Sequence, residues 1–172
     1  GANFFDTTRL QGHELFTGIS EEMDVKGTLD IALQLNSDTR QIVVVNDTTT
    51  TGQRIHDKIS RFIADYPDVE FRFLEDVSMA EVRETVSLLP QDSLVYYTLF
   101  FRDNAGGFFE YDTSTLAVTE QSVVPVYGTW DFSLGYGIVG GKLTSGYTEG
   151  QRAGQLALRI LQGERVQDIP VE

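Results

Sequence analysis

The stretch QIVVVNDTTTTGQRIHDKISRFI, residues 41–63, decides the predicted fold. Its first part, 41–46, is a continuous run of mostly β-branched apolar residues, which is typical of a strand buried on both faces of a parallel sheet. In the polar segment that follows, Thr50 and Gln53 have the spacing of a helix capping box. Apolar residues then recur at helical spacing, at Ile55, Ile59, Phe62 and Ile63. A buried strand followed by an amphipathic helix is the repeating unit of a parallel α/β sheet.

The same alternation recurs along the chain. The patterns predict strands at 41–46, 69–74, 93–101, 123–127 and 137–143, with 69–74 near an edge because its residues alternate between apolar and polar. They predict helices from Asp24 to about Asn36, from Thr50 to before Pro67, from Ser78 to before Pro90, over 113–122, and from Thr148 to Gly163. We therefore expect a three-layer, doubly wound α/β fold with a mostly parallel sheet, and a ligand side at the carboxyl ends of its strands.

The composition is that of a folded globular domain and restricts its partners. Of the 172 residues, 41% are hydrophobic and 11% are aromatic, which is enough for a substantial core. Thirteen Lys and Arg against 26 Asp and Glu give a formal net charge of -13. Such a surface repels polyanions, so we expect no nucleic-acid partner.

The chain has no cysteine, which excludes thiol catalysis, disulfides and cysteine-ligated zinc. The sequence contains neither an apolar run of about 18 residues nor a signal-peptide pattern.

Polar residues follow the first predicted strand, at the sheet edge where open α/β folds bind ligands. Asp47, Thr48 and Thr49 offer hydroxyls and backbone N–H groups at a helix N-terminus, where a carboxylate or phosphate is readily held. Simple capping of the helix explains the same residues equally well. The chain lacks the G-x-G-x-x-G and G-x-x-x-x-G-K-[ST] patterns, so a nucleotide site is not indicated.

Aromatic residues lie at the ends of two further strands. Phe101 is the last residue of the third predicted strand and Arg102 directly follows it. An arginine beside aromatic rings can clamp a carboxylate while the rings cover an apolar body. Trp130 and Tyr136 come after the fourth strand and are suited to stacking on a planar or sugar ligand. A surface ion pair for Arg102 and core packing for Trp130 are the alternatives. The loops after the first, third and fourth predicted strands should all lie at one edge of the sheet, and this favours ligand binding over these alternatives.

The sequence patterns that would indicate catalysis are weaker than those that indicate binding. His13 and His56 lie far apart and have no metal-ligand spacing, and no G-x-S-x-G motif marks a nucleophile. A phosphorylatable receiver module is also doubly wound, but Asp47 stands alone and the third strand ends in Leu99, Phe100 and Phe101. We therefore predict no catalytic residue, no metal ligand and no cofactor. A receiver-like module or a small α/β enzyme stays as the alternative of another class.

Four segments together resemble a known family: TGISEEMDVKGTLDIALQLNSDTRQIVVVND (17–47), YTLFFRDNAG (97–106), VPVYGTWDFSLGYGIVGG (124–141) and EGQRAGQLALRILQGERVQDIPVE (149–172). They resemble the second lobe of the ABC-type substrate-binding proteins with a type I periplasmic-binding fold. More narrowly, they are similar to the version found in extracytoplasmic sensor domains of bacterial histidine kinases and related signalling proteins.

The resemblance implies a non-catalytic domain in which two lobes close on a small ligand. This lobe's side of the cleft would comprise Asp47, Thr48, Thr49, Phe101, Arg102, Trp130 and Tyr136. Residues 1–22 would be a hinge segment left from a first lobe that is missing, residues 23–172 the ligand-binding lobe, and residues 146–172 a segment that crosses back toward the first lobe.

The last helix has an apolar stripe at Ala153, Leu156, Ala157 and Ile160. Without a first lobe, we expect this stripe to fold onto its own sheet or to pair with a second copy in a homodimer. The expected function is that of a small-molecule sensor in the extracytoplasmic region of a membrane-anchored signalling protein. The solute-binding component of an ABC importer is the alternative within the binding class.

Overall fold

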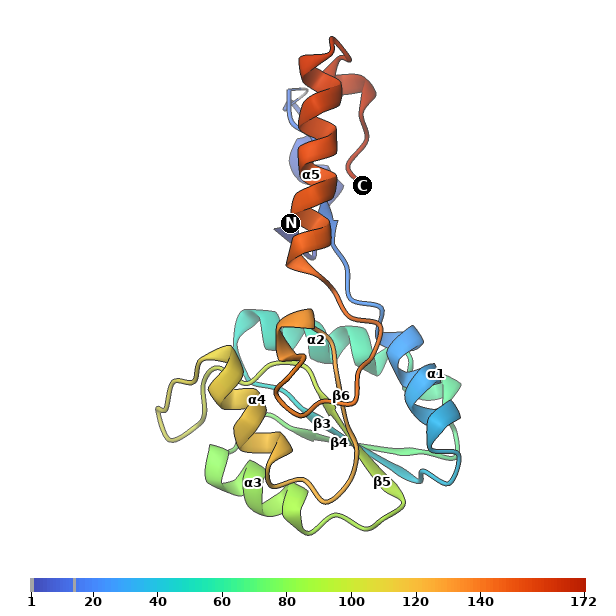
Figure 1. Cartoon of the computed structure of the whole chain (residues 1–172), viewed down its shortest axis with the longest axis vertical. Coiled ribbons are helices and arrows are strands. Elements are labelled where there is room, and N and C mark those ends of the chain that lie inside the picture. Colours follow the sequence, from blue (N-terminus) through green and yellow to red (C-terminus); the bar gives the residue numbers. More distant parts are fainter. Residues whose placement is uncertain (1, 14) are drawn as a thin grey trace. The chain divides into compact units, whose positions relative to one another are not determined.

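The computed structural model describes residues 2–13 and 15–172 and divides the chain into two compact units. The larger unit is Asp24–Leu143, and the smaller one combines Gly1–Met23 with Thr144–Glu172. Both units are drawn in Figure 1. We describe each by itself.

The larger unit is built on a parallel sheet. Its strands lie in the order β4 (Glu70–Leu74), β3 (Gln41–Val45), β5 (Ser93–Tyr97) and β6 (Val126–Gly128). In the register, Val45 pairs with both Leu74 and Tyr97, and Tyr97 pairs with Gly128, so the strands end level with one another. The residues that directly follow the four strands therefore meet at one edge.

Helices cover both faces of this sheet (Figure 1). α1 (Val25–Leu35) and α2 (Thr50–Ser60) lie on one face, and α3 (Met79–Ser87) and α4 (Tyr111–Thr119) lie on the other. The three-layer, doubly wound α/β fold predicted from the sequence is confirmed.

β3 is buried on both faces, as its apolar run predicts. Val43 and Val45 point into the cluster that contains Val82 of α3 and Val118 of α4. The alternate side chains, of which Val44 is one, point to the opposite face and are also fully buried. A central strand of this kind leaves its carboxyl end as the part of the strand that can meet a ligand.

Glycines prevent the predicted fifth strand at 137–143. In the described residues this stretch makes only a single bridge, between Gly140 and Tyr127, although Val139 N still donates to Val126 O at 2.8 Å. Gly137 has a φ of 93°, which is a left-handed conformation incompatible with a strand. The prediction of a regular strand was therefore wrong.

The ends of three other elements also differ from the prediction. β5 ends at Tyr97 rather than at residue 101. α2 is capped by Thr49 rather than Thr50, because the Thr49 hydroxyl accepts from the N–H of Gly52. The last helix, α5 (Gly146–Leu161), begins earlier than predicted because Ser145 accepts from Thr148 N and serves as its cap. For α2 and α5, a neighbouring hydroxyl has the better geometry for capping the helix. For β5, the chain leaves the strand conformation before residue 101.

The smaller unit joins the two ends of the chain. It contains the short parallel pair β1 (Ala2–Asn3) and β2 (Ser20–Glu21), the 3-10 helices Thr7–Leu10 and Val166–Asp168, and α5. Leu156 of α5 is buried against Ile19 and Ile169. Folding of the α5 stripe onto the sheet and pairing of α5 with a second copy both stay predictions. The assignment of 1–22 and 146–172 to a hinge and a crossing segment also stays a prediction.

Candidate ligand-binding site

Asn46 and Asp47, the two residues after β3, are fully buried polar residues. The Asn46 amide nitrogen donates to Gly52 O at 2.9 Å and to Glu75 Oε1 at 2.8 Å. The Asn46 amide oxygen accepts from the Thr98 hydroxyl at 3.0 Å. Asn46 thus connects the ends of β3, β4 and β5 with the first turn of α2.

Asp47 fixes two loops at once. Its Oδ1 accepts from the backbone N–H and the hydroxyl of Thr49, at 2.9 and 2.5 Å. Its Oδ2 accepts from the backbone N–H of Phe101 at 2.9 Å. The contact lies between the ends of β3 and β5, the point where the order of strands reverses and where doubly wound sheets bind their ligands. Asp47 therefore holds the loops of the candidate site in place.

A row of aromatic rings crosses the ends of β5 and β6. Phe101 packs edge-to-face on Tyr111 with ring centres 4.6 Å apart, and Tyr111 lies 4.3 Å from Phe132. Phe132 stacks in parallel on Trp130 at 5.8 Å. Trp130 is only 7% exposed, whereas Phe132 and Tyr111 are 38% and 49% exposed. The row thus has a buried end at Trp130 and an accessible surface at Tyr111 and Phe132.

Arg102 and Tyr136 are placed differently from the other predicted residues. Arg102 is exposed, and its guanidinium lies 4.3 Å from the ring centre of the exposed Phe108, with which Arg102 also forms an antiparallel bridge. Tyr136 accepts a hydrogen bond through its backbone carbonyl from the Thr119 hydroxyl at 2.7 Å. No ring contact in the described part of the chain joins Tyr136 to the aromatic row. The structure thus brings Asp47, Thr49 and Phe101 together, and links Phe101 to Trp130 through other rings.

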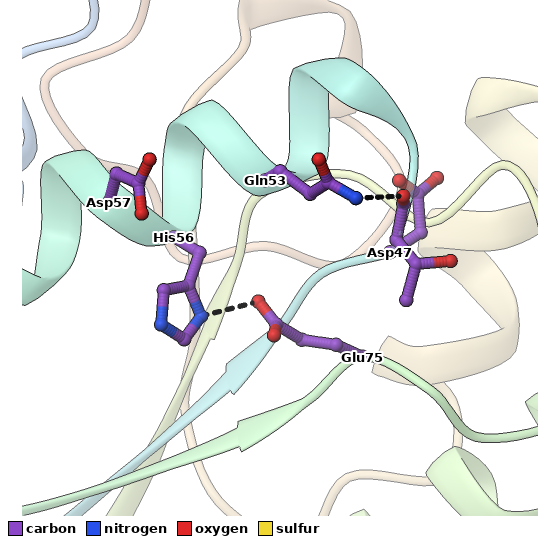
Figure 2. A pocket seen from close by; sticks show the side chains of 6 residues that line it. Asp47, Gln53, His56, Asp57 and Glu75 are labelled. Atoms are coloured by element: carbon purple, nitrogen blue, oxygen red, sulfur yellow. Dashed lines mark hydrogen bonds and ion pairs between the residues drawn. The ribbon is translucent and has the colours of Figure 1, made fainter.

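A pocket of about 210 Å³ lies on the other side of Asp47 (Figure 2). It is lined by Asp47, Thr48, Gln53, His56, Asp57 and Glu75. His56 Nδ1 lies 2.9 Å from Glu75 Oε1, and the imidazole packs on Phe73 with ring centres 4.2 Å apart. The Gln53 amide nitrogen donates to Thr48 O at 3.2 Å. α2 and the loop after β4 therefore form the walls of this pocket.

Burial and hydrogen bonding shift the pKa values of groups around this edge. Burial raises the pKa of the Tyr96 hydroxyl to about 12, so this group beneath Thr129 stays neutral. Hydrogen bonds from the backbone N–H groups of Met79 and Gly107 lower the pKa of Asp103. Asp103 thereby joins the loop after β5 to the start of α3 in its ionised form.

The sequence patterns missed Tyr111, Gln53, His56, Asp57 and Glu75. Glu75 directly follows a predicted strand, so the strand-end rule that selected Asp47 would also have selected it. The other four lie on helices, and of these only Gln53 belongs to a predicted motif, the capping box with Thr50. His56 was considered only as a metal ligand. In the described ranges, no group of three or more His, Asp or Glu is arranged to hold a metal ion.

The structure also bears on membrane insertion. Within residues 2–13 and 15–172, no helix combines the length and the apolar character needed to cross a membrane.

Comparisons with known proteins give structural relatives only. No family model matches the sequence, and none of the curated proteins matches it. One similar structure is the ligand-free, open form of CD0873, a substrate binding protein with adhesive properties from Clostridium difficile, with a TM-score of 0.65 and 20% identity over 91% of this chain and 52% of that chain.

Two further structures give similar values. A conserved domain protein from Vibrio cholerae has a TM-score of 0.60 and 16% identity, over 90% of this chain and 51% of that one. An ABC domain in complex with L-Trp from Streptococcus pneumonia has a TM-score of 0.62 and 13% identity, over 91% and 52%. This chain thus spans about half the length of each. It has a periplasmic-binding-protein-like fold, and the extent of the match is that of a single lobe.

Proposed function

We propose that this chain is a non-catalytic, small-molecule-binding lobe whose ligand lies at the carboxyl edge of the sheet. The observation that carries the proposal is the partly exposed aromatic row beside Asp47 at the reversal of strand order. Apolar rings next to a few fixed polar groups are the usual composition of a small-molecule site. The fold shared with substrate-binding proteins supports the same function.

In this proposal the seven predicted residues have different roles. Phe101 contacts the ligand together with Tyr111 and Phe132, while Trp130 supports Phe132 from behind. Thr48 and Thr49 offer polar groups, and Arg102 and Tyr136 approach the ligand from loops at the rim. Asp47, which is fully buried, acts by positioning Thr49 and the backbone of Phe101.

The first ligands to test carry a planar ring. A ring can stack on the exposed faces of Tyr111 and Phe132, and such aromatic pairs contribute about 0.5–1.5 kcal/mol beyond the burial of area. The similar structure from Streptococcus pneumonia contains L-Trp, which supports aromatic amino acids as the initial candidates.

We further propose that the lobe belongs to the extracytoplasmic sensor region of a membrane-anchored signalling protein of the histidine kinase type. A first lobe would complete the cleft, and ligand would shift the equilibrium between open and closed lobes. Support for this role comes from the sequence resemblance. The alternative is the solute-binding component of an ABC importer, favoured by the similarity to a substrate binding protein and an ABC domain.

A thermal-shift screen of amino acids, nucleobases and sugars on the two-lobed protein tests the binding function. A ligand at 100 times its Kd adds about 2.7 kcal/mol of stability, which raises Tm by several degrees. Trp130→Ala and Arg102→Ala should reduce the shift, whereas Leu88→Ala, an exposed change on the larger unit, should not. Absence of a shift with every compound, or equal shifts in all variants, contradicts the proposal.

The parent gene distinguishes the two roles. A transmembrane segment and a kinase domain encoded after Glu172 would establish the sensor, whereas a neighbouring permease gene and a lipoprotein signal would establish the importer component.

A further inference from the structure

Four buried hydroxyl groups lie on the elements that carry the aromatic row. They belong to Tyr97 at the end of β5, to Ser114 and Thr115 in α4, and to Ser133 in the 3-10 helix Asp131–Ser133. We call these four side chains the hydroxyl cluster. All four are buried, so the cluster can act on a ligand only through other residues.

The hydroxyls of the cluster contact one another. Tyr97 donates to Ser114 Oγ at 2.8 Å, and the hydroxyl oxygens of Thr115 and Ser133 are 3.3 Å apart. Tyr97 also contacts the side chain of Thr115, which connects the two pairs. Burial raises the pKa of the Tyr97 hydroxyl, so this group stays a neutral donor.

Two of the ring-bearing segments accept a hydrogen bond from the cluster. The Ser114 hydroxyl donates to the backbone carbonyl of Phe100 at 2.7 Å, directly before Phe101. The Thr115 hydroxyl donates to the backbone carbonyl of Tyr111, also at 2.7 Å. The cluster thus fixes the backbone next to the first ring of the row and the backbone of the second.

The third ring is connected to the second through Thr115. Because the proton of Thr115 is used on the carbonyl of Tyr111, the Ser133 hydroxyl is the donor to Thr115 Oγ1. Ser133 directly follows Phe132 in the chain. Thr115 therefore joins the two segments whose rings, Tyr111 and Phe132, lie 4.3 Å apart.

Hydroxyl groups are a costly way to fill a buried space. Valine has nearly the shape of threonine and would fill the place of Thr115 without burying a polar group. A satisfied network of hydrogen bonds adds direction, because it holds its members in one arrangement. Tyr111 and Phe132 are 49% and 38% exposed, so packing holds these rings from the inner side only.

We propose that the hydroxyl cluster positions the rings of Phe101, Tyr111 and Phe132, with Thr115 and Ser133 as positioning residues for a ring-bearing ligand. The proposal rests on the proposed function, because it concerns the same rings. It adds that the placement of the rings relative to one another decides how well a planar ligand binds. A planar group can stack on Tyr111 and Phe132 together only while their rings keep this arrangement.

NMR of the Tyr111 ring tests the placement without a ligand. The rings of Phe101 and Phe132 lie 4.6 and 4.3 Å away, so their ring currents should displace the Tyr111 proton signals from ordinary tyrosine positions. Thr115→Val and Ser133→Ala should each move these signals toward the ordinary positions. Thr115→Ser keeps the hydroxyl and should keep the displacement. Tyr111→Phe assigns the signals.

Calorimetric titration of the chain with L-tryptophan tests the effect on binding. Thr115→Val and Ser133→Ala should each raise Kd about threefold to tenfold, because stacking on one ring is weakened, whereas Thr115→Ser should not. Thr39→Val is the matched control. Thr39 is also buried, and its hydroxyl donates to the backbone carbonyl of Asn36 at 2.7 Å, away from the rings. This control should change neither Kd nor the Tyr111 signals.

The two measurements separate the cluster from the proposed function. Unchanged Tyr111 signals in Thr115→Val and Ser133→Ala overturn the positioning role, and binding of L-tryptophan then leaves the proposed function standing. Signals that move as expected, without binding of any ring-bearing compound in the thermal-shift screen, support the positioning of the rings and contradict the ring-binding function.

Three further outcomes also overturn the proposal. One is an unchanged Kd in variants whose Tyr111 signals have moved, since the placement of the rings would then not matter for binding. Another is an equal effect of Thr39→Val. The third is unfolding of both Thr115→Val and Ser133→Ala, seen by circular dichroism, because the cluster would then support the fold as a whole.

Discussion

The backbone N–H of Phe101 donates a 2.9 Å hydrogen bond to Oδ2 of Asp47, across 54 positions of sequence. The bond fastens the loop after β5 to the loop after β3 at the point where the order of strands reverses. Phe101 is also the first ring of the aromatic row. A buried carboxylate thus fixes the start of the surface that we propose to bind ligand.

Replacing Asp47 by alanine should destabilise the larger unit. The change leaves the part-buried N–H groups of Thr49 and Phe101 without their acceptor, at about 1–3 kcal/mol for each donor, so we expect a loss of about 2–6 kcal/mol in the free energy of unfolding. Urea denaturation measures this loss. Asp57→Ala, on the exposed side of α2, should change the stability by less than about 0.5 kcal/mol. A similar loss in both variants would contradict the role of Asp47.

Shortening the aromatic row should weaken a ring-bearing ligand more than it weakens the fold. Phe132 is 38% exposed and touches both Trp130 and Tyr111, so Phe132→Leu removes stacking surface at the centre of the row. We expect Kd for the best ring-bearing hit to rise about fivefold to tenfold. Phe71→Leu, at the opposite end of β4, should leave Kd unchanged. Fluorescence of Trp130, the single tryptophan, reports the titration.

Short-range patterns predicted the sheet because its central strands carry unambiguous signals. The run 41–45 can bury its apolar side chains on both faces only between two layers of helices. The alternation of apolar and polar residues at 69–74 matches the position of β4 at the edge of the sheet. The prediction failed at 137–143, where the pattern is apolar but Gly137 adopts a left-handed conformation. Local hydrophobicity contains no information about that choice of φ.

The candidate site was predictable only where a side chain directly follows a strand. That rule selected Asp47 and would have selected Glu75, whereas Phe101 was selected as the last residue of the third predicted strand. It could not select Tyr111, which reaches the row from the first residue of α4. Rows of rings depend on how helices dock on the sheet, and that docking is set by contacts distant in sequence.

Gly52 should be irreplaceable even by alanine. A Cβ at this position would overlap the backbone oxygen of Asp47, so α2 could not keep its place beside the loop. We expect Gly52→Ala to cost more than about 2 kcal/mol, as for other substitutions that overfill a packed site. Gly154→Ala in α5 is the matched control, since its Cβ would meet nothing within 4 Å. That change should stabilise the helix by about 0.5–1 kcal/mol. Thermal denaturation compares the two variants.

Acid should loosen the loop after β5 through Asp103. Its pKa is lowered by the N–H groups of Met79 and Gly107, so the folded state binds this proton less readily than the unfolded state. The contribution of the Asp103 carboxylate to the free energy of unfolding is therefore fully present above the ordinary Asp pKa of about 3.9. It is lost as the pH falls through the pKa of Asp103 in the folded state. NMR titration of the carboxyl should show the lowered pKa. Asp103→Asn should flatten the fall of stability below about pH 4, and Asp68→Asn should not.

The smaller unit should depend on Leu156, although most of α5 is exposed. Leu156 is 4% exposed and packs on Ile19 and Ile169, so it joins residues from both ends of the chain. We expect Leu156→Ala to destabilise this unit by about 2–5 kcal/mol, the usual range for a buried leucine. Hydrogen exchange should then accelerate in α5 and leave β3 protected, because Leu156 packs within the smaller unit and β3 belongs to the larger one. Leu161→Ala, at a position that is 82% exposed, should leave the exchange of α5 unchanged. If the second variant also accelerates exchange, Leu161 is covered in solution, and the pairing of α5 with a second copy gains its first support.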